Sequence, residues 1–285
     1  CCTYCAIPSI RGRFRSRTME SIEDEVRRLA ENGVKEVILV AQDTTRYGED
    51  LYGSGRLPEL LGRLCRINGI KWIRMLYTYP ERITDELIDV MATEEKVVNY
   101  LDIPVQHCND TVLKRMNRRS TKSALTELFK KLRDRLPDVT IRTTLITGFP
   151  GETEEQFEEL CEFVREIRFD RLGCFAYSEE EGTVAAGFAD QIDRQVRVDR
   201  SEMIMNDQLA IILEKNAEKV GTVKEVLIEG YDDYIKCYFG RTSSDAPEID
   251  GKVFFISPKP LVIGTFENVR INDSLEYDLL GELEE

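Results

Sequence analysis

The sequence has few of the features that mark membrane, secreted or zinc-binding proteins. Its apolar stretches all fall short of the roughly 20 residues that a membrane-spanning helix needs. No signal-peptide pattern stands at its start, so we expect a soluble, cytoplasmic protein that does not contact a membrane. There is one histidine, His107, and one CxxC pair, so no second pair completes a zinc site. A starting methionine is also absent, and we expect a piece of a longer protein.

The composition is that of a globular protein with reduced cysteines. With 285 residues, the chain is long enough for one large domain and a small second one. Of its eight cysteines, five stand singly in apolar or periodic stretches, which is typical of buried thiols rather than disulfides. These five are Cys65, Cys108, Cys161, Cys174 and Cys237.

The opening segment CCTYCAIPSIRGRFRSR differs from the rest of the chain. It has three cysteines within five residues, arginines at alternate positions and no acidic residue, whereas the whole chain carries a formal charge of −14. A basic, thiol-rich segment in an acidic protein indicates a place where an anion is bound.

Apolar strands and amphipathic helices alternate along the first 180 residues or so. Helical spacing covers 22–32, and the β-branched run 35–42 that follows is typical of a strand buried on both faces. Thr153 and Gln156 predict a capping box at the start of a later helix. Further helices are expected over 58–66, 84–93, 121–136 and from 153, and strands over 72–79, 100–106, 139–149 and 170–178. This order predicts an α/β fold with a parallel sheet, closed or partly closed into a barrel, whose chemistry lies at the carboxyl ends of the strands.

A second domain is expected after a long helical stretch over 193–219. From 220 the sequence shows short alternating runs separated by Gly, Asp and Pro, which predict an antiparallel β-barrel of about five strands. We therefore divide the chain into domains at 1–219 and 220–285. The second contains six basic and fourteen acidic residues, a net charge of −8.

The pair Cys2 and Cys5 fits three kinds of site by spacing alone. A zinc half-site needs a second pair, which is absent. A redox dithiol usually opens a helix, whereas Pro8 and the arginines favour an irregular loop. An iron–sulfur site with one ligand upstream of residue 1 is the remaining alternative.

The segment CTYCAIPSIRGRFRSR resembles the last two cysteines of the CxxxCxxC loop of the radical S-adenosylmethionine enzymes. Tyr4 matches the aromatic residue before the final cysteine, and the first cysteine falls three positions before Cys1, outside this sequence. Cys1 matches no ligand position. The segments AQDTTRYG, IPVQHCNDTVLKRMNRR, TTLITGFPGET and FAYSEEEGTVAA resemble the methylthiotransferase branch of that superfamily, and the terminal β-domain resembles its TRAM module.

The resemblance implies a fold, two cofactors and their ligands. The fold is a partial TIM-like (β/α)6 radical SAM barrel, with its first strand missing from this chain, followed by a TRAM barrel. Cys2 and Cys5 become metal ligands of a 4Fe–4S cluster whose third cysteine lies outside the chain, and S-adenosylmethionine occupies the open iron. A second 4Fe–4S cluster is implied in an N-terminal domain. The implied cofactor-binding residues are Tyr4 near the adenine, Gln42 and Asp43 at the ribose or amino group, and Gly148 and Gly151 at the adenosyl part.

Three residues are candidates for catalysis. If the arginine-rich segment is extended, its alternate side chains share a face, and Arg11 and Arg17 are the preferred contacts to substrate or cofactor. The alternative is that these arginines pair with acidic surface residues. His107 ends a strand, but a lone histidine is more often a packed structural residue. A second basic stretch, Lys114 to Lys122, either lines the same mouth or forms a solvated helix face.

The branch includes enzymes for tRNA adenosines and for an aspartate of the small subunit's twelfth ribosomal protein. An acidic terminal module repels tRNA and attracts a basic ribosomal protein. The segment GRTSSDAPEIDGKVFF also resembles the protein-modifying enzymes. We therefore expect methylthiolation of the ribosomal-protein aspartate, with an electron donor of unknown identity and without tRNA. A tRNA methylthiotransferase is the alternative within the family. A non-catalytic recognition fragment is the alternative of another class, because this chain alone is expected to be inactive.

Overall fold

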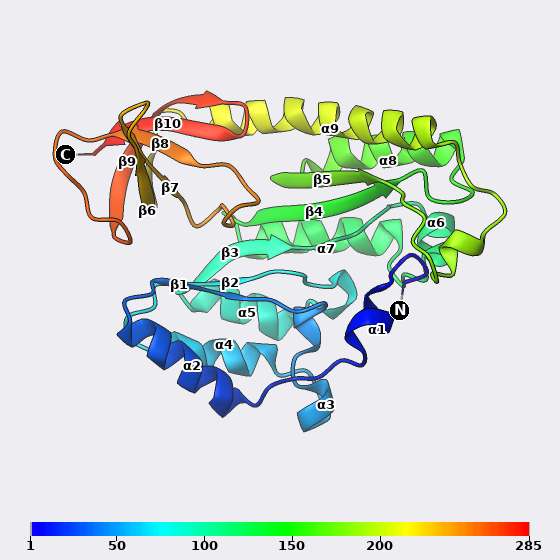
Figure 1. Cartoon of the computed structure of the whole chain (residues 1–285), viewed down its shortest axis with the longest axis horizontal. Coiled ribbons are helices and arrows are strands. Elements are labelled where there is room, and N and C mark those ends of the chain that lie inside the picture. The colour runs from blue at the N-terminus through cyan, green and yellow to red at the C-terminus, as the bar shows by residue number, and fades with distance from the viewer. Residues whose placement is uncertain (1, 285) are drawn as a thin grey trace.

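The apolar runs of the first domain form one parallel sheet in the computed structural model, which describes residues 2–284 (Figure 1). Its strands lie in chain order, β1-β2-β3-β4-β5, and every neighbouring pair is parallel. The five predicted strands and the parallel α/β fold are thereby confirmed. The strands are β1 (Glu36–Leu39), β2 (Trp72–Met75), β3 (Val97–Asp102), β4 (Thr140–Thr147) and β5 (Arg171–Ala176).

Helices cover this sheet and enclose its main hydrophobic core. Threonine side chains cap four of them, and Thr153 with Gln156 forms the predicted capping box. The long helix α9 packs against β5 and α8. Within the described residues, no helix has both the length and the apolar character to cross a bilayer. The helices are α2 (Met19–Glu31), α4 (Leu57–Cys65), α5 (Asp85–Thr93), α7 (Lys122–Arg135), α8 (Glu154–Ile167) and α9 (Arg194–Ala217).

Three short helices were not predicted: α1 (Ile7–Arg11), α3 (Glu49–Tyr52) and α6 (Asp110–Arg115). The helix α1 changes the interpretation of the arginine-rich segment. Pro8 stands in its first turn, where no backbone N–H is needed, and Gly12 ends it at a φ of 77°. Arg11 therefore lies in a helix, and the expectation that it shares an extended face with the later arginines is wrong.

The second domain is a closed five-stranded barrel with the strand order β10-β8-β7-β6-β9. The expectation of a wholly antiparallel barrel is wrong at one place, because β10 and β8 pair in parallel. The reason is geometric: strands of alternating direction cannot close a ring with an odd number of members. The strands are β6 (Val223–Asp232), β7 (Cys237–Arg241), β8 (Val253–Ile256), β9 (Phe266–Leu275) and β10 (Asp278–Leu283).

The connection between β7 and β8, residues 242–252, joins the two domains at the amino ends of the parallel strands (Figure 1). Arg74 of β2 donates a 2.9 Å hydrogen bond to the Ser243 carbonyl. The Tyr100 hydroxyl of β3 lies 2.6 Å from an Asp250 carboxylate oxygen. Arg171 of β5 forms a buried ion pair with Asp245. The segment DAPEID is therefore a plug in the base of the sheet. The side chains of Asp245 and Asp250 are buried in it, whereas Glu248 is exposed.

Candidate functional site

The cysteine loop lies at the carboxyl ends of the parallel strands, opposite the second domain (Figure 1). Thr3 anchors it to two other connections. Its backbone N–H donates to the Met116 carbonyl at 3.1 Å, and its hydroxyl donates to the Arg115 carbonyl at 2.9 Å. Its own carbonyl accepts a 2.9 Å hydrogen bond from the Ala185 N–H. The loop is therefore held between the segments that follow β3 and β5, where parallel α/β folds place their chemistry.

Both cysteines of the pair have free, partly exposed side chains. The Cys5 N–H donates to the Cys2 carbonyl at 3.2 Å, which folds the four residues into a turn. Cys1 lies outside the described residues. Among residues 2–284, no group of three or more His, Cys, Asp or Glu side chains is arranged to hold a metal ion. Two thiols on one turn would supply two ligands to a metal or cluster at this edge.

Tyr79 and Arg118 lie directly beside the cysteine turn. The Tyr79 hydroxyl is 3.5 Å from the Cys2 sulfur, and burial, followed by the proximity of Cys2, raises the pKa of Tyr79 so that the phenol stays protonated. The Arg118 guanidinium lies 4.6 Å over the Tyr79 ring. Burial, with a further contribution from Cys2, also raises the pKa of Tyr4. Sequence reasoning did not connect Tyr79 to this site, because the residues lie far apart along the chain.

Tyr4 packs into a small aromatic cluster at the same edge of the sheet. Its ring centroid is 6.3 Å from that of Phe149, in an edge-to-face arrangement. Phe149 in turn contacts Tyr177 and Phe188, at centroid distances of 5.4 and 6.2 Å. The cluster makes an apolar wall beside the cysteine turn. Whether Tyr4 contacts an adenine is not tested by these contacts and stays a prediction.

Gln42 and Asp43 follow β1 at the same end of the sheet. The Gln42 side chain is exposed, whereas Asp43 is buried and accepts a hydrogen bond from the Thr45 hydroxyl. The Arg82 guanidinium approaches the second Asp43 oxygen at 3.6 Å. Burial raises the pKa of Asp43 despite these partners. The Tyr79 N–H points at the Thr45 hydroxyl at 3.4 Å, so this loop adjoins the cysteine turn.

The glycines of ITGFPGET have an intramolecular explanation. Gly148 and Gly151 have φ angles of 68° and 78°, which favour glycine. A Cβ at Gly148 would lie 2.3 Å from the Arg197 Cγ, and one at Gly151 would lie 2.3 Å from an Asp190 carboxylate oxygen. The space above both glycines is therefore filled by the protein's own side chains. Their contact with the adenosyl part of a cofactor stays a prediction. The presence of glycine at these positions does not support it, because intramolecular packing already requires glycine there.

Glu152, in the same turn, was missed by sequence reasoning. Its carboxylate accepts two hydrogen bonds from the Gly148 N–H, at 3.0 and 3.1 Å, and one from Arg200 at 2.7 Å. The Nδ1 atom of the fully buried His107 accepts a hydrogen bond from the Asn109 N–H, so the ring proton is on Nε2. This Nε2 lies 3.3 Å from a Glu152 carboxylate oxygen. Glu152 therefore fixes the shape of the turn. His107 is packed as a structural residue would be, and its catalytic role stays an untested prediction. The sequence signal that could have identified Glu152 is its position directly before Thr153, the N-cap of α8.

The arginines that were predicted to touch substrate or cofactor differ in their surroundings. Arg17 forms an ion pair with Glu25 and donates to the Ser21 carbonyl and hydroxyl at 3.1 and 2.9 Å. It thus follows the alternative of surface pairing. Arg11 is exposed at the end of α1. Arg17 and Asp43 both line a cavity of about 460 Å³ that runs along β1.

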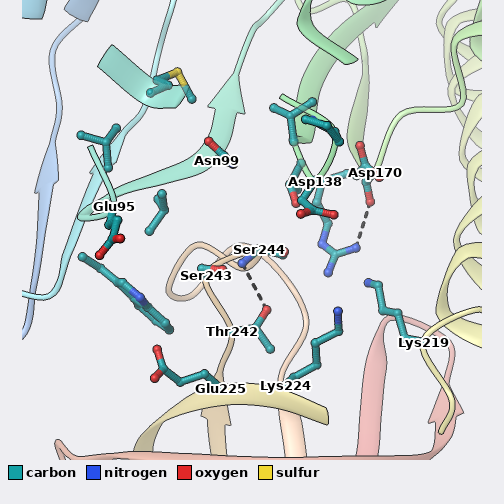
Figure 2. Close-up of a pocket in the computed structure, with 18 of the residues that line it drawn as sticks. Glu95, Asn99, Asp138, Asp170, Lys219, Lys224, Glu225, Thr242, Ser243 and Ser244 are labelled. Carbon is teal, nitrogen blue, oxygen red and sulfur yellow. Dashed lines mark hydrogen bonds between the residues drawn. The ribbon is translucent and has the colours of Figure 1, made fainter. Parts of the chain in front are cut away.

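A larger cavity of about 730 Å³ lies at the other end of the sheet, between the two domains. Figure 2 shows Lys219 and Lys224 on one side of it and Glu95 on another, with Ser243 and Ser244 of the inter-domain connection between them. Burial, together with the nearby Arg171, lowers the pKa of Lys219 to about 8. None of the sequence-predicted site residues lines this cavity, and its charges are mixed in sign. The chemistry expected from the sequence belongs to the cysteine edge.

Comparisons with known proteins place this geometry in a family. The model of the radical SAM superfamily matches residues 1–164, and that of the TRAM domain matches residues 220–283. Two curated relatives, from Clostridium acetobutylicum and Desulforamulus reducens, are both named ribosomal protein uS12 methylthiotransferase RimO. Each is 53% identical, over 98% and 99% of this chain and over 62% and 64% of their own lengths. The chain thus spans less than two thirds of these relatives.

Two solved structures share the fold at low sequence identity. The radical S-adenosylmethionine methyltransferase TsrM of Kitasatospora setae has a TM-score of 0.53 and 15% identity, over 80% of this chain and 40% of its own. Coproporphyrinogen III oxidase of Escherichia coli has a TM-score of 0.50 and 19% identity, over 75% of this chain and 50% of its own. These likenesses support the α/β architecture of the sheet and its helices.

Proposed function

The chain belongs to the radical SAM superfamily, and from that premise we propose that it is the radical SAM and TRAM portion of a methylthiotransferase. Its proposed reaction adds a methylthio group to the β-carbon of an aspartate in ribosomal protein uS12. The observation that carries the proposal is the CxxC turn, held by Thr3 at the carboxyl edge of the parallel sheet. The names of relatives more than 50% identical over nearly the whole chain support the choice of substrate.

Cys2 and Cys5 are proposed to hold a 4Fe–4S cluster together with a third cysteine, expected three positions before Cys1. The residues present fit such a group, because both thiols lie on one accessible turn and a buried cation, Arg118, stands behind it. A cluster held there would have one iron open to S-adenosylmethionine and would supply the electron for its reductive cleavage. A second cluster, expected in an N-terminal domain, is the proposed place of the inserted sulfur. The 285 residues alone are therefore expected not to methylthiolate.

The chain's own residues position and shield the cofactors in this proposal. The aromatic cluster around Phe149 keeps water from the face of the cysteine turn. Glu152 holds the Gly148–Gly151 turn in its shape, so that its backbone is fixed when a ligand arrives. Tyr4, Gln42 and Asp43 are the proposed contacts to S-adenosylmethionine, since their loops adjoin the cysteines.

The TRAM barrel is the proposed contact to the basic ribosomal protein. The side chains of Asp245 and Asp250 are buried in the plug, so recognition must depend on acids that stay exposed, such as Asp233, Asp273 and Glu276. The same acids disfavour tRNA. The domain boundary after residue 219 remains part of the proposal, as does action in the cytoplasm, which agrees with the free, buried thiols of the core.

The test is to incubate the complete gene product anaerobically with S-adenosylmethionine, a reductant and either uS12 or tRNA. The expected result is a uS12 aspartate peptide heavier by one methylthio group and unmodified tRNA nucleosides. Binding of uS12 should weaken as salt increases. Modified tRNA adenosine with unmodified uS12 would reverse the choice of substrate. If the cluster can be reduced but neither uS12 nor tRNA is modified, the result would favour the non-catalytic alternative.

A further inference from the structure

Arg118 is a buried cation that forms no direct ion pair with a carboxylate in the part of the chain that the structure describes. The residue is 7% exposed. Nη2 donates a 2.7 Å hydrogen bond to the Pro104 carbonyl, whereas Nε is buried and has no hydrogen-bond partner. Burying a guanidinium is costly unless an anion compensates its charge. The negative charge of Glu81 acts on Arg118 from nearby, but no ion pair to it forms within residues 2–284. The buried Nε–H of Arg118 is therefore left available to a further anion at this edge.

The surroundings of Arg118 indicate where that anion lies. Its guanidinium stacks 4.6 Å over the ring of Tyr79, and the hydroxyl of the same ring is 3.5 Å from the Cys2 sulfur. The neighbouring Arg119 is exposed, so burial of a basic side chain is specific to Arg118 within this segment. The stack of Arg118 on Tyr79 thus leads to the proposed cluster ligand.

We propose that Arg118 and Tyr79 together raise the reduction potential of the cluster that Cys2 and Cys5 hold. In this arrangement, Tyr79 donates its O–H to the thiolate sulfur of Cys2, and Arg118 supplies a positive charge behind the ring. Reduction takes one electron from an external low-potential donor and adds one negative charge to the cluster, and both groups stabilise the more negative state. The inference rests on the proposed function, and it assigns these two residues a positioning role that acts on the electron-transfer step.

The experiment is a redox titration of the complete gene product with its clusters reconstituted anaerobically. Electron paramagnetic resonance follows the reduced cluster whose signal changes when S-adenosylmethionine is added, which identifies the cluster on Cys2 and Cys5. The variants are Arg118→Met, Arg118→Lys, Tyr79→Phe and the double variant with Met and Phe. Arg119→Met is the matched control, because it removes the same charge one residue away from an exposed position.

We expect Arg118→Met to lower the reduction equilibrium constant at least about tenfold, which is about 59 mV for one electron. Arg118→Lys should recover most of the loss, Tyr79→Phe should shift the potential in the same direction by less, and Arg119→Met should change nothing. The Tyr79→Phe shift should also be smaller in the Arg118→Met background, because the two groups act through one stack.

Three outcomes would overturn the inference or its premise. An unchanged potential in Arg118→Met and Tyr79→Phe would refute it. An unchanged potential with weakened S-adenosylmethionine binding would refute it too, and would assign Arg118 to the cofactor's carboxylate. If Arg118→Met fails to assemble a cluster, Tyr79→Phe and Arg118→Lys still decide the matter. A wild-type protein without any S-adenosylmethionine-responsive cluster would instead refute the proposed function.

Discussion

Replacing Arg171 with methionine should separate the energetic contribution of the inter-domain plug from that of ordinary surface charge. Arg171 is 6% exposed, forms an ion pair with Asp245 and lies 3.8 Å from an Asp250 oxygen. Methionine keeps most of the volume but leaves the buried Asp245 carboxylate without its ion-pair partner. Asp250 keeps one neighbouring cation, Arg142, at 3.8 Å. Removal of one partner of a buried pair costs about 3–5 kcal/mol. At about 2–4 °C per kcal/mol, the expected loss in Tm is about 6–20 °C.

Arg168→Met is the matched control. Arg168 pairs with Glu214, and the two side chains are 41% and 64% exposed, so this pair contributes about 0–1 kcal/mol. Thermal unfolding at neutral pH, followed by circular dichroism, should show a clearly larger loss for Arg171→Met than for the control. Equal Tm values for the two variants would refute the argument that the plug depends on buried charge pairs.

The pH dependence gives the same variant a second readout. Burial acts to raise the pKa of Asp245, but Arg171 and the Thr242 hydroxyl hold it below its usual value. The stabilisation from Asp245 is therefore present at neutral pH and is lost as pH falls through its lowered folded-state pKa. Burial raises the pKa of Asp250, so its ionised form costs stability at neutral pH and this cost disappears on acidification. Without Arg171, the pKa of the buried Asp245 should rise, so acid relieves the cost of its charge in the variant at a higher pH than it removes the stabilisation in wild type. The Tm difference between wild type and Arg171→Met should hence narrow as the pH falls from 7 towards about 4.

Three further substitutions test the turn after β4. Gly148→Ala should lower the free energy of unfolding, measured by urea titration, by more than about 1 kcal/mol, because the new Cβ would lie 2.3 Å from the Arg197 side chain of α9. The control Gly62→Ala, which has open space around it in α4, should be neutral or stabilising in the same titration. Glu152→Gln should lower the free energy of unfolding by about 1–3 kcal/mol, since Arg200 loses a buried charged partner. If Glu152→Gln is as stable as the exposed control Glu158→Gln, the structural role of Glu152 is contradicted. Thr153→Ala removes the capping box and should lower the free energy of unfolding by about 1 kcal/mol. An unchanged urea midpoint would argue against a stabilising role of this capping box.

The elements of the fold were predictable where a local pattern determines them. Strands such as β4 appear as runs rich in β-branched residues, and the capping box of Thr153 with Gln156 depends only on residues three apart. The change at residue 220 to short alternating runs indicated the second barrel for the same reason. Short helices such as α1 and α6 escaped prediction, because one or two turns leave too few residues for a periodic pattern.

The side-chain partners within the site were not predictable, because they join distant segments. Arg118 and Tyr79 meet only when the connections after β2 and β3 come together, and no local pattern records that contact. Gly148 suggested room for a ligand, yet the structure fills that space with Arg197 of α9. The acids of DAPEID counted as surface charge in the sequence, whereas Asp245 and Asp250 lie in the plug. Composition gives the number of charges, and only the packing shows which of them reach solvent.

The central claim is that Cys2 and Cys5 are two ligands of an iron–sulfur cluster with one open iron. Its most direct test is iron analysis and electron paramagnetic resonance of the anaerobically reconstituted complete gene product, as wild type, Cys2→Ala, Cys5→Ala and the control Cys237→Ala. We predict that wild type and Cys237→Ala show a reduced-cluster signal that changes with S-adenosylmethionine, and that both other variants lose this signal. An iron-free wild type, or an unaltered signal in Cys2→Ala and Cys5→Ala, would contradict the account.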